Sequence, residues 1–285
     1  MIYLLFLGCE KTSLHTDLSS VSEDGNFSTI TYNVHGLPSQ ITGDDTPKRM
    51  EQIAPKLQDY DFIALQEDFD DANHQLLIQN NYFKTVRRFN EILEDKFYGS
   101  GLSFLAVNKM DIPESYTEIH YESCYGEFSN SSDCLASKGF QKIRFALSED
   151  CFIDFYNTHL EAGGGIEDHE VRVLQVHMLI NTIQQSDGNT IPILMGDINL
   201  RPSDDMDIDL WNTLLEEGDF TDSCEATSCS EIDHIDRILY WPTNQNQTCI
   251  VQANDWYNEQ HFVDNTGVPL SDHPPIRVDF SWWLD

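Results

Sequence analysis

The chain has 285 residues, 40% of them hydrophobic, and its 16 Lys and Arg stand against 49 Asp and Glu for a net charge of −33. This length and apolar content allow a sizeable core in one large domain or two. Proteins that grip nucleic acid through its backbone present a basic surface, so the charge argues against tight, nonspecific DNA binding. Solubility in salty surroundings is the alternative explanation of the acidity.

Residues 1–9 are apolar and end in Gly-Cys at Cys9, which resembles the end of a bacterial lipoprotein signal. A short buried strand is the alternative interpretation of this run. Residues 10–26 are polar and rich in Ser and Asp, as in a disordered tether. We expect a signal segment at 1–9, a tether at 10–26, and a single domain over 27–285.

Six cysteines remain after Cys9, an even number that suits up to three disulfides in an oxidising compartment. Cys124 with Cys134, and Cys224 with Cys229, are candidate pairs because they are near in sequence, although pairing cannot be read from spacing alone. No Cys-x-x-Cys spacing supports zinc binding. The sequence thus predicts a secreted or cell-surface protein.

Strands and helices alternate along the chain from Phe27 onward. Apolar, β-branched runs predict strands, and capped runs of helical period predict helices. Strands are expected at 27–34, 61–66, 101–107, 139–147, 151–158, 191–195, 235–241 and 275–280, and helices at 46–58, 71–79, 168–185 and 209–216. Thr46 and Pro47 are expected to open the first helix as cap and first-turn proline. Val171, Leu174, Met178 and Ile183 are expected on one face of the 168–185 helix.

The strands at 139–147 and 151–158 are joined by a short polar connection, which predicts an antiparallel hairpin. The sheets are therefore not all parallel. Helices between the other strands would cover the outer faces, giving an α/β layered body.

Polar side chains stand at equivalent ends of these strands. Four strands end in polar groups and two late strands begin with them; the residues are Asn33, Glu67, His159, Asp197, Asn199, Asp236, Asp272 and His273. If the two late strands run antiparallel to the others, all eight gather at one rim of the sheets. Asp197 and Asn199 are expected to face the same way, because side chains alternate along a strand.

Such a rim suits metal-assisted hydrolysis of a phosphoester. Glu67 with amide oxygens and waters suits Mg²⁺, with Mn²⁺ or Ca²⁺ as alternatives, since these ions prefer hard oxygen ligands. The metal would polarise a phosphoryl oxygen and stabilise the leaving oxygen. His273 can deprotonate an attacking water if a carboxylate fixes its tautomer.

Six segments resemble the ordered motifs of the endonuclease/exonuclease/phosphatase superfamily. They are Tyr-Asn-Val-His (32–35), Leu-Gln-Glu (65–67), Asn-Thr-His-Leu (157–160), Gly-Asp-Ile-Asn (196–199), Ile-Asp-Arg-Ile-Leu (235–239) and Ser-Asp-His (271–273). The resemblance implies a four-layer sandwich of two mixed, largely antiparallel β-sheets flanked by helices, and makes 27–285 a single metal-dependent phosphohydrolase domain.

The resemblance also implies a role for each residue at the rim. Glu67 is the chief metal ligand, Asn33 lies beside it, and Asp272 assists on the metal side. Asp197 and Asn199 orient the nucleophile and phosphate, while His159 contacts the phosphate or leaving group. His273 is the general base, supported by Asp236.

The segment Asp-Cys-Leu-Ala-Ser-Lys-Gly-Phe (133–140) resembles the Asn-Lys-Gly-Phe strand start of bacterial neutral sphingomyelinases. Lys138 would then offer a charge to the substrate phosphate; an exposed lysine at a strand edge is the alternative. Sphingomyelinases carry an aromatic hairpin that enters the bilayer interface, and Trp256 and Tyr257 occupy the corresponding region. This hairpin region is shorter than in the family, and burial in the core is the alternative for both rings.

The function expected on this basis is that of a sphingomyelinase-like phospholipase C, a monomer that releases phosphocholine at a membrane surface with no obligate protein partner. A secreted nuclease is the second hypothesis, but its few cations, Lys84, Arg87, Arg88 and Lys96, are too sparse for a basic groove. A noncatalytic, surface-tethered binding module is the third. The presence of all the motif residues argues against it.

Overall fold

The computed structural model describes residues 24–107, 113–126, 130–231 and 233–285, which form two six-stranded sheets. The first sheet has the order β11-β12-β1-β2-β4-β3, and the second β5-β6-β7-β8-β10-β9. The strands of the first sheet are β1 (Asp24–Asn33), β2 (Phe62–Gln66), β3 (Phe83–Phe89), β4 (Leu102–Val107), β11 (Cys249–Asn258) and β12 (Ile276–Leu284). Those of the second are β5 (Ser115–His120), β6 (Gly139–Ala146), β7 (Phe152–His159), β8 (Thr190–Asp197), β9 (Thr221–Asp222) and β10 (Asp236–Tyr240).

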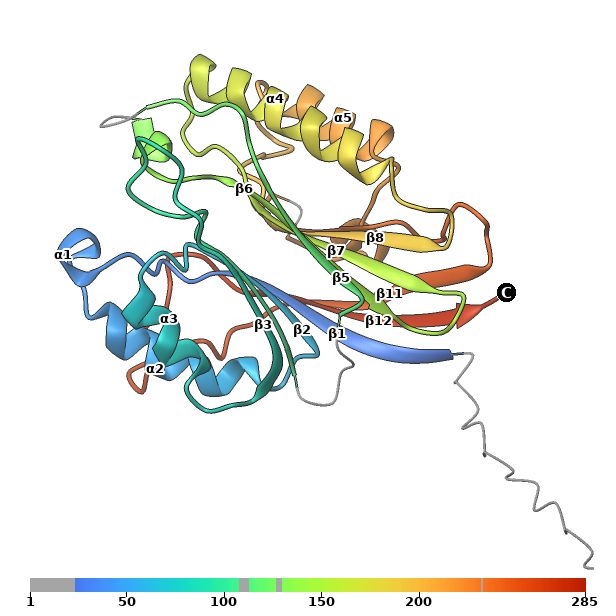
Figure 1. Ribbon diagram of the computed structural model, residues 1–285, viewed down its shortest axis with the longest axis horizontal. Helices are drawn as coiled ribbons and strands as arrows, with labels where there is room; N and C mark the ends of the chain where they lie inside the picture. Colours follow the sequence, from blue (N-terminus) through green and yellow to red (C-terminus); the bar gives the residue numbers. More distant parts are fainter. Residues whose placement is uncertain (1–23, 108–112, 127–129, 232) are drawn as a thin grey trace, which may run out of the picture.

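Helices cover the outer face of each sheet (Figure 1). On one side lie α1 (Ser39–Thr42), α2 (Thr46–Leu57) and α3 (Asp71–Ile78), and on the other α4 (Ile166–Ile183) and α5 (Ile208–Glu217). Two short elements, the 3-10 turn η1 (Asn130–Leu135) and α6 (Ser223–Ala226), lie in loops. The four-layer sandwich expected from the motifs is confirmed.

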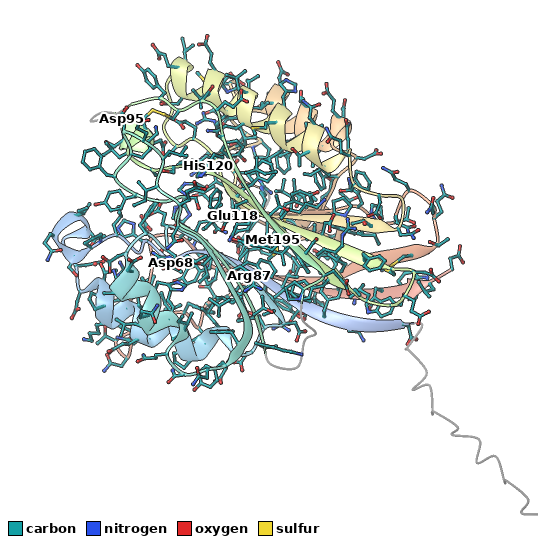
Figure 2. The ribbon with its side chains drawn as sticks, viewed as in Figure 1. Asp68, Arg87, Asp95, Glu118, His120 and Met195 are labelled. Atoms are coloured by element: carbon teal, nitrogen blue, oxygen red, sulfur yellow. A yellow bond between two sulfur atoms is a disulfide. The ribbon has the colours of Figure 1, made fainter. Side chains whose placement is uncertain are left out.

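The main core fills the space between the two sheets. Phe62 of β2 and Phe155 of β7 are both fully buried, and their ring centroids lie 4.4 Å apart. Met195 lies among the side chains between the layers (Figure 2). A second cluster, including Met50 and Ile63, packs α2 against the outside of the first sheet.

Strand direction brings the predicted polar residues to one end of the sandwich. β1 runs parallel to β2, and β7 parallel to β8, so these four strands deliver their carboxyl ends to the same rim. β12 is antiparallel to β1 and β10 is antiparallel to β8, so both begin at that rim. Asp236 is directly opposite Asp197 in the register. We call this end the catalytic rim.

Three sequence expectations differ from the structure in detail. The N-cap of α2 is Asp45, whose side chain accepts from the backbone of Lys48, so Thr46 begins the helix instead of capping it. Leu174 of α4 is 56% exposed, because Val176, Leu179 and Ile180 form the buried face that its neighbours Val171 and Ile183 share. Asn199 lies beyond the end of β8 with a positive φ of 47°, so the alternation of a strand does not apply to it.

Three disulfides cross-link the domain: Cys124–Cys134, Cys151–Cys249 and Cys224–Cys229. The two candidate pairs proposed from proximity are confirmed, and the third joins β11 to the residue before β7. Disulfides are typical of extracytoplasmic proteins. Among the described helices, none combines the length and apolar character needed to cross a bilayer. The signal and lipidation expected at 1–9, and residues 10–23 of the expected tether, lie outside the described residues. The last three residues of that tether, 24–26, instead belong to β1 and pair with β12, so the domain begins earlier than expected.

Candidate active site

Six of the eight predicted side chains form one chain of polar contacts at the catalytic rim. The amide nitrogen of Asn33 donates to Glu67 Oε1 at 2.9 Å and to Asp197 Oδ2 at 3.2 Å, which links the two sheets. Asp197 Oδ2 lies 3.5 Å from His159 Nε2 and 3.8 Å from His273 Nδ1. His273 Nδ1 in turn lies 2.9 Å from Asp236 Oδ2.

His273 and Asp236 form a paired imidazole and carboxylate. Asp236 is 1% exposed at the start of β10, and His273 lies in the loop before β12. Burial by itself lowers the pKa of His273, but the hydrogen bond and charge of Asp236 outweigh it and raise the pKa to about 10. The carboxylate of Asp236 therefore stabilises the imidazolium that forms when His273 takes up a proton. Its geometry leaves Nε2 as the ring nitrogen that can exchange a proton with a reacting group.

Asp197 lies at the centre of the site and is 2% exposed. Burial raises its pKa to about 7, and the nearby charge of Asp236 acts in the same direction. Asp197, Asp236 and His273 also form a group whose ligand atoms lie within 4.8 Å of one another among the described residues. The hydrogen bond between His273 and Asp236 favours a proton-transfer pair over a metal site at these three residues.

His159 at the end of β7 is buried beside Asp197. Burial, together with the positive charges of Lys138 and His273, holds the pKa of this imidazole well below its usual range. Its Nδ1 has no hydrogen-bond partner among the described residues. A neutral ring with one unsatisfied nitrogen is suited to donate a hydrogen bond to a phosphate oxygen without adding a buried charge.

His35 was not singled out from the sequence, although it closes the Tyr-Asn-Val-His motif. Its Nδ1 lies 3.6 Å from Glu67 Oε2 and 3.4 Å from Asp272 Oδ1, between the two carboxylates predicted for the metal side. His35 and Glu67 both have positive φ, at 48° and 57°. Non-glycine residues rarely adopt this backbone region, and such strain is common at functional sites.

Asn199 and Lys138 both bind the loop that follows His159. The amide nitrogen of Asn199 donates to the carbonyl of Leu160 at 3.2 Å, and Lys138 Nζ donates to the same carbonyl at 2.7 Å. Lys138 is only 4% exposed and is also paired with Asp133. It is therefore not the exposed edge lysine considered as an alternative. Its ammonium lies behind the catalytic rim, where it fixes the backbone after His159.

Glu161 belongs to the same buried set of charges and was not predicted as notable. Its Oε1 accepts from the backbone of Tyr125 at 2.6 Å, and the backbone carbonyl of Glu161 accepts from Arg172. Burial raises the pKa of its carboxyl to about 7, and the charge of Asp133 adds to this effect. The strand-end pattern could not identify Glu161, because it depends on packing against α4.

Trp256 and Tyr257 are part of strand β11, after a bulge between Ala253 and Asp255, and not of a protruding hairpin. Residues Asp255–Asn258 of β11 pair in register with β12. Trp256 is partly buried against the main core and its ring centroid lies 5.2 Å from that of His234. Tyr257 remains 42% exposed, with the Arg277 guanidinium 5.0 Å from its ring centroid.

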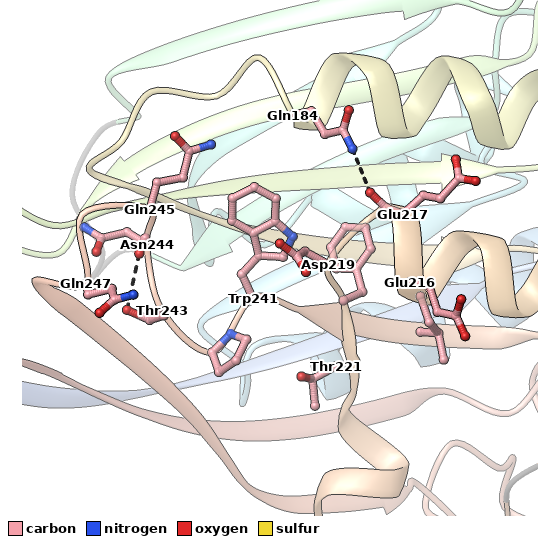
Figure 3. Close-up of a pocket in the computed structure, with 13 residues that line it drawn as sticks. Gln184, Glu216, Glu217, Asp219, Thr221, Trp241, Thr243, Asn244, Gln245 and Gln247 are labelled. Carbon is pink, nitrogen blue, oxygen red and sulfur yellow. Dashed lines mark hydrogen bonds between the residues drawn. The ribbon is translucent and has the colours of Figure 1, made fainter.

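A cavity lies at the end of the sandwich opposite the catalytic rim. It has a volume of about 590 Å³ and is lined by residues including Phe220, Trp241, Asn244 and Gln247 (Figure 3). Trp241 follows the far end of β10, whereas Asp236 begins that strand at the rim. A smaller cavity of about 280 Å³ is lined by Glu259, Phe262, Asp272 and His273 and opens directly beside the site.

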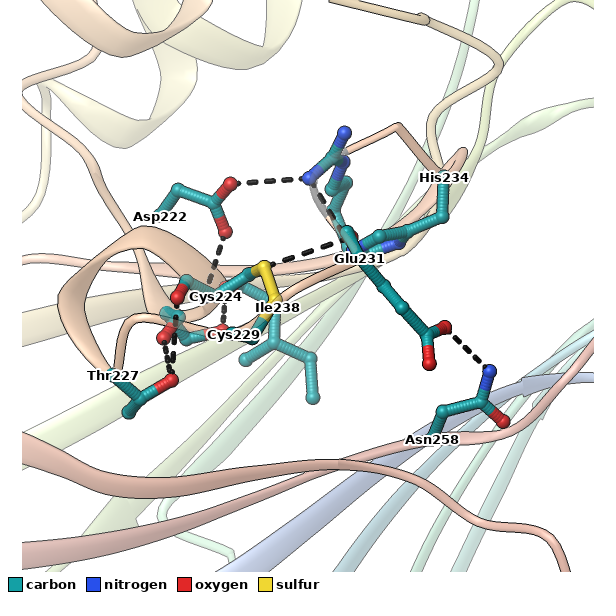
Figure 4. The surroundings of a disulfide bond; sticks show 10 residues. Asp222, Cys224, Thr227, Cys229, Glu231, His234, Ile238 and Asn258 are labelled. Carbon is teal, nitrogen blue, oxygen red and sulfur yellow. Dashed lines mark hydrogen bonds and ion pairs between the residues drawn. A yellow bond between two sulfur atoms is a disulfide. The ribbon is translucent and has the colours of Figure 1, made fainter.

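The Cys224–Cys229 disulfide closes the segment that leads into Asp236 (Figure 4). Asp222 before it accepts from the buried guanidinium of Arg237 at 3.1 Å. Glu231 after it accepts from the Asn258 side chain at 2.7 Å. These contacts anchor both ends of the segment, and so fix the start of β10 that carries Asp236.

Comparison with known proteins identifies the family. The model of the Endonuclease/Exonuclease/phosphatase family matches residues 30–273, and the chain belongs to this family. Sphingomyelinases from Mycobacterium bovis and Mycobacterium tuberculosis are each 29% identical to it over 281 residues, covering 92% of this chain and 54% of those proteins. The chain thus spans about half the length of the curated relatives it matches.

Solved structures share the fold at low identity. Sphingomyelinase C from Streptomyces griseocarneus matches with a TM-score of 0.64 at 15% identity, covering 90% of this chain and 99% of that one. A Staphylococcus aureus beta toxin mutant with bound magnesium ions matches with a TM-score of 0.66 at 13% identity, covering 89% of this chain and 99% of that one. A humanized D. rerio TDP2 matches with a TM-score of 0.69 at 17% identity, covering 90% of this chain and 98% of that one. At these identities the likeness shows the fold alone.

Proposed function

We propose that this protein is a divalent-metal-dependent phosphodiesterase that hydrolyses a phosphoester by in-line attack of an activated water. The observation that carries the proposal is the His273–Asp236 pair beside Asp197, at a rim that also holds Glu67. Family membership supports this assignment, because the motif residues that define the site lie within the matched residues 30–273.

Each side chain has a role that follows from its position. Asp236 holds the Nδ1 proton of His273, so Nε2 can take the proton of the attacking water. Asp197, between both histidines, can orient that water together with Asn199. His159 donates to the phosphate from its neutral ring. Asn33 positions the carboxylates of Glu67 and Asp197 through its amide nitrogen.

The metal side fits a hard cation. Glu67 and Asp272 direct carboxylate oxygens at His35 from either side, and such oxygens are the ligands that Mg²⁺ prefers. Glu67 and Asp272 would hold Mg²⁺, with Asn33 beside them on the metal side and with Mn²⁺ or Ca²⁺ as alternatives. The ion would polarise a phosphoryl oxygen and stabilise charge on the leaving oxygen.

We infer that the substrate is a phospholipid with a phosphocholine head group, as in sphingomyelin. Relatives named sphingomyelinase support this, and so does the net charge of −33, which disfavours anionic DNA more than a zwitterionic head group. Two cations considered for a nucleic-acid groove are engaged elsewhere: Arg88 donates to the carbonyls of Asp68 and Phe69, and Lys96 to that of Cys134. Lys138, which is buried behind the rim, would act on the phosphate only through the loop it binds.

We propose that the protein acts outside the cytoplasm as a monomer. The three disulfides support an oxidising compartment. Anchoring through an acylated Cys9 remains part of this proposal, as does the division into a signal at 1–9, a tether that follows it and ends before β1, and a single catalytic domain from β1 to residue 285.

The test compares substrates under one set of conditions. Purified protein is assayed against sphingomyelin, phosphatidylcholine, inositol phosphates and plasmid DNA, with Mg²⁺ and with chelator. We expect phosphocholine release from sphingomyelin that chelator abolishes, and that Asp197→Ala and His273→Ala each abolish. Nicking of DNA without lipid hydrolysis would support the nuclease instead, and full activity of either variant would refute the chemical assignment.

A further inference from the structure

Exposed apolar side chains are concentrated at the catalytic rim. Ten large apolar residues are exposed in the described part of the chain, and all but Leu174 lie in rim loops or at the rim ends of helices and strands. The nine are Ile41, Ile92, Leu93, Phe97, Ile166, Met206, Ile208, Tyr257 and Val268. The described loops at the opposite end expose none. Single exposed apolar residues are ordinary, but their confinement to one end indicates a contact surface there.

Three of these residues lie in one loop between β3 and β4. Ile92, Leu93 and Phe97 are 55%, 36% and 64% exposed, and we call residues 90–99 the apolar loop. The loop lies at the rim end of the molecule, as the position of Asp95 shows (Figure 2). It therefore presents a cluster of aliphatic and aromatic side chains next to the site.

The backbone of the apolar loop is fixed, although its side chains face solvent. The amide of Leu93 donates to Ser137 Oγ at 3.0 Å, and the amide of Phe97 donates to the carbonyl of Leu135 at 2.8 Å. Lys96 Nζ donates to the carbonyl of Cys134, next to the Cys124–Cys134 disulfide. The apolar side chains are thus held outward by their own braced backbone, which reduces the entropy lost on docking.

The apolar loop and the residues that follow it contact the segment after Glu67. The amide of Asp68, which follows Glu67, donates to the carbonyl of Gly101 at 2.9 Å. The Tyr98 ring centroid lies 5.8 Å from that of Phe69. A surface that contacts the apolar loop therefore also adjoins Glu67.

We propose that the apolar loop docks the catalytic rim onto an electrically neutral lipid surface, with Ile92, Leu93 and Phe97 entering the interface. Aliphatic and aromatic side chains on a surface element bind membranes by burying apolar area at the boundary between head groups and acyl chains. The docking deepens the proposed phospholipid hydrolysis and rests on it, because it brings the site to head-group level.

The charge of the protein indicates that the partner of the apolar loop is an electrically neutral bilayer. The chain carries a net charge of −33, and Glu91, Glu94 and Asp95 are exposed within the apolar loop itself. Anionic lipid and a second copy of the chain would both be repelled. The apolar side chains of the loop are also interspersed with the exposed acidic residues Glu91, Glu94 and Asp95, whereas a protein interface has a contiguous apolar core. A fluid bilayer can accept separated side chains.

The test measures binding without catalysis. The full chain is mixed with phosphatidylcholine vesicles in chelator and sedimented, alongside an Ile92→Ser/Leu93→Ser/Phe97→Ser variant. We expect the triple variant to partition at least about tenfold more weakly, since each exposed side chain contributes only part of its burial free energy. Leu174→Ser is the matched control, an exposed apolar residue away from the rim, and should bind like the unaltered chain. Unchanged thermal unfolding verifies that both variants are folded.

A second assay separates docking from chemistry. Hydrolysis of the water-soluble ester p-nitrophenyl phosphocholine with Mg²⁺ should be equal in the triple variant and the unaltered chain, while hydrolysis of vesicle sphingomyelin falls. Equal vesicle binding by the triple variant, or equal loss in Leu174→Ser, would overturn the docking and leave the hydrolysis standing. Vesicle binding without hydrolysis of either ester would instead overturn the proposed function.

Two further outcomes would show that the apolar loop binds a different partner. Stronger binding to vesicles containing phosphatidylglycerol would contradict the neutral surface inferred from the charge. A dimer in analytical ultracentrifugation that the triple variant dissociates would make a second copy of the chain the partner, and would overturn the lipid proposal.

Discussion

Asp236 accepts a hydrogen bond from His273 across 2.9 Å, although the residues are 37 positions apart and only Asp236 belongs to the second sheet, whereas His273 precedes β12 of the first. Asp236 begins β10 and is held in register opposite Asp197, while His273 is in the loop entering β12. The pair therefore exists only when both sheets are packed together. This makes the proton-transfer geometry a consequence of the sandwich itself.

Asp236→Asn removes the charge while keeping the side chain's shape. We expect kcat to fall about 100- to 10,000-fold, the range typical of general acid–base groups. The pKa of His273 should also fall from about 10 toward its usual range, because the hydrogen bond and charge that raise it are lost. Kinetics and an NMR titration of His273 measure the two effects. Asp255→Asn, an exposed change on β11, is the control. An unchanged kcat would contradict the pairing's role.

Glu67→Gln replaces the proposed chief metal ligand by a neutral group of similar size. We expect the affinity for Mg²⁺ to fall by more than about tenfold, since a hard cation loses an anionic oxygen. Isothermal titration calorimetry with Mg²⁺ and Mn²⁺ measures this without substrate. Glu91→Gln removes an exposed rim glutamate that is not a proposed ligand, and should leave the affinity unchanged. Equal affinity in Glu67→Gln would place the ion elsewhere.

Glu161→Gln should change how stability depends on pH. In the folded protein burial raises the pKa of this carboxyl from 4.5 to about 7, so the folded state holds the proton more tightly than the unfolded state. The contribution of Glu161 to the free energy of unfolding should therefore be largest below pH 4.5 and be lost as the pH rises to about 7, by at most roughly 3 kcal/mol. Urea unfolding at several pH values in this range measures how steeply the free energy of unfolding changes with pH. The slope should be smaller in Glu161→Gln, and identical slopes in both proteins would contradict the account.

The disulfides should contribute unequally to stability. Cys151–Cys249 spans 98 positions and Cys224–Cys229 spans 5. A cross-link restricts the unfolded chain more when its loop is longer, which gives about 4.7 kcal/mol for the first and about 2 kcal/mol for the second in the chain-entropy model. Replacing each pair by Ser and measuring chemical unfolding tests this order. A greater loss from the shorter loop would show that local anchoring of Asp236's segment dominates.

The buried strands were predictable from sequence, whereas the edge strands were not. The strands missed are β3, β5, β9 and β11, which are the four sheet edges. An edge strand is partly solvated and mixes charged with apolar residues, as β3 does with the sequence FKTVRRF, so its apolar signal is weak. Four of the central strands, β2, β4, β8 and β10, are buried on both faces and have largely apolar sequences.

The site was predictable where strand ends determine it. Asn33, Asp197 and Asp236 lie at the ends of central strands, so their meeting follows from strand direction. His35 and Asn199 depend on left-handed backbone beyond strand ends, which periodicity cannot reveal. The burial of Lys138 depends on its pairing with Asp133 across a disulfide-closed loop, a tertiary contact that no local pattern encodes.

The most direct test of the central claim is phosphocholine release from sphingomyelin by the purified chain with Mg²⁺, with chelator, and with His273→Ala. We predict release with Mg²⁺ that both chelator and the substitution abolish. Release that survives chelator, or an unaltered protein that hydrolyses no phosphocholine ester while it cuts DNA, would contradict the claim.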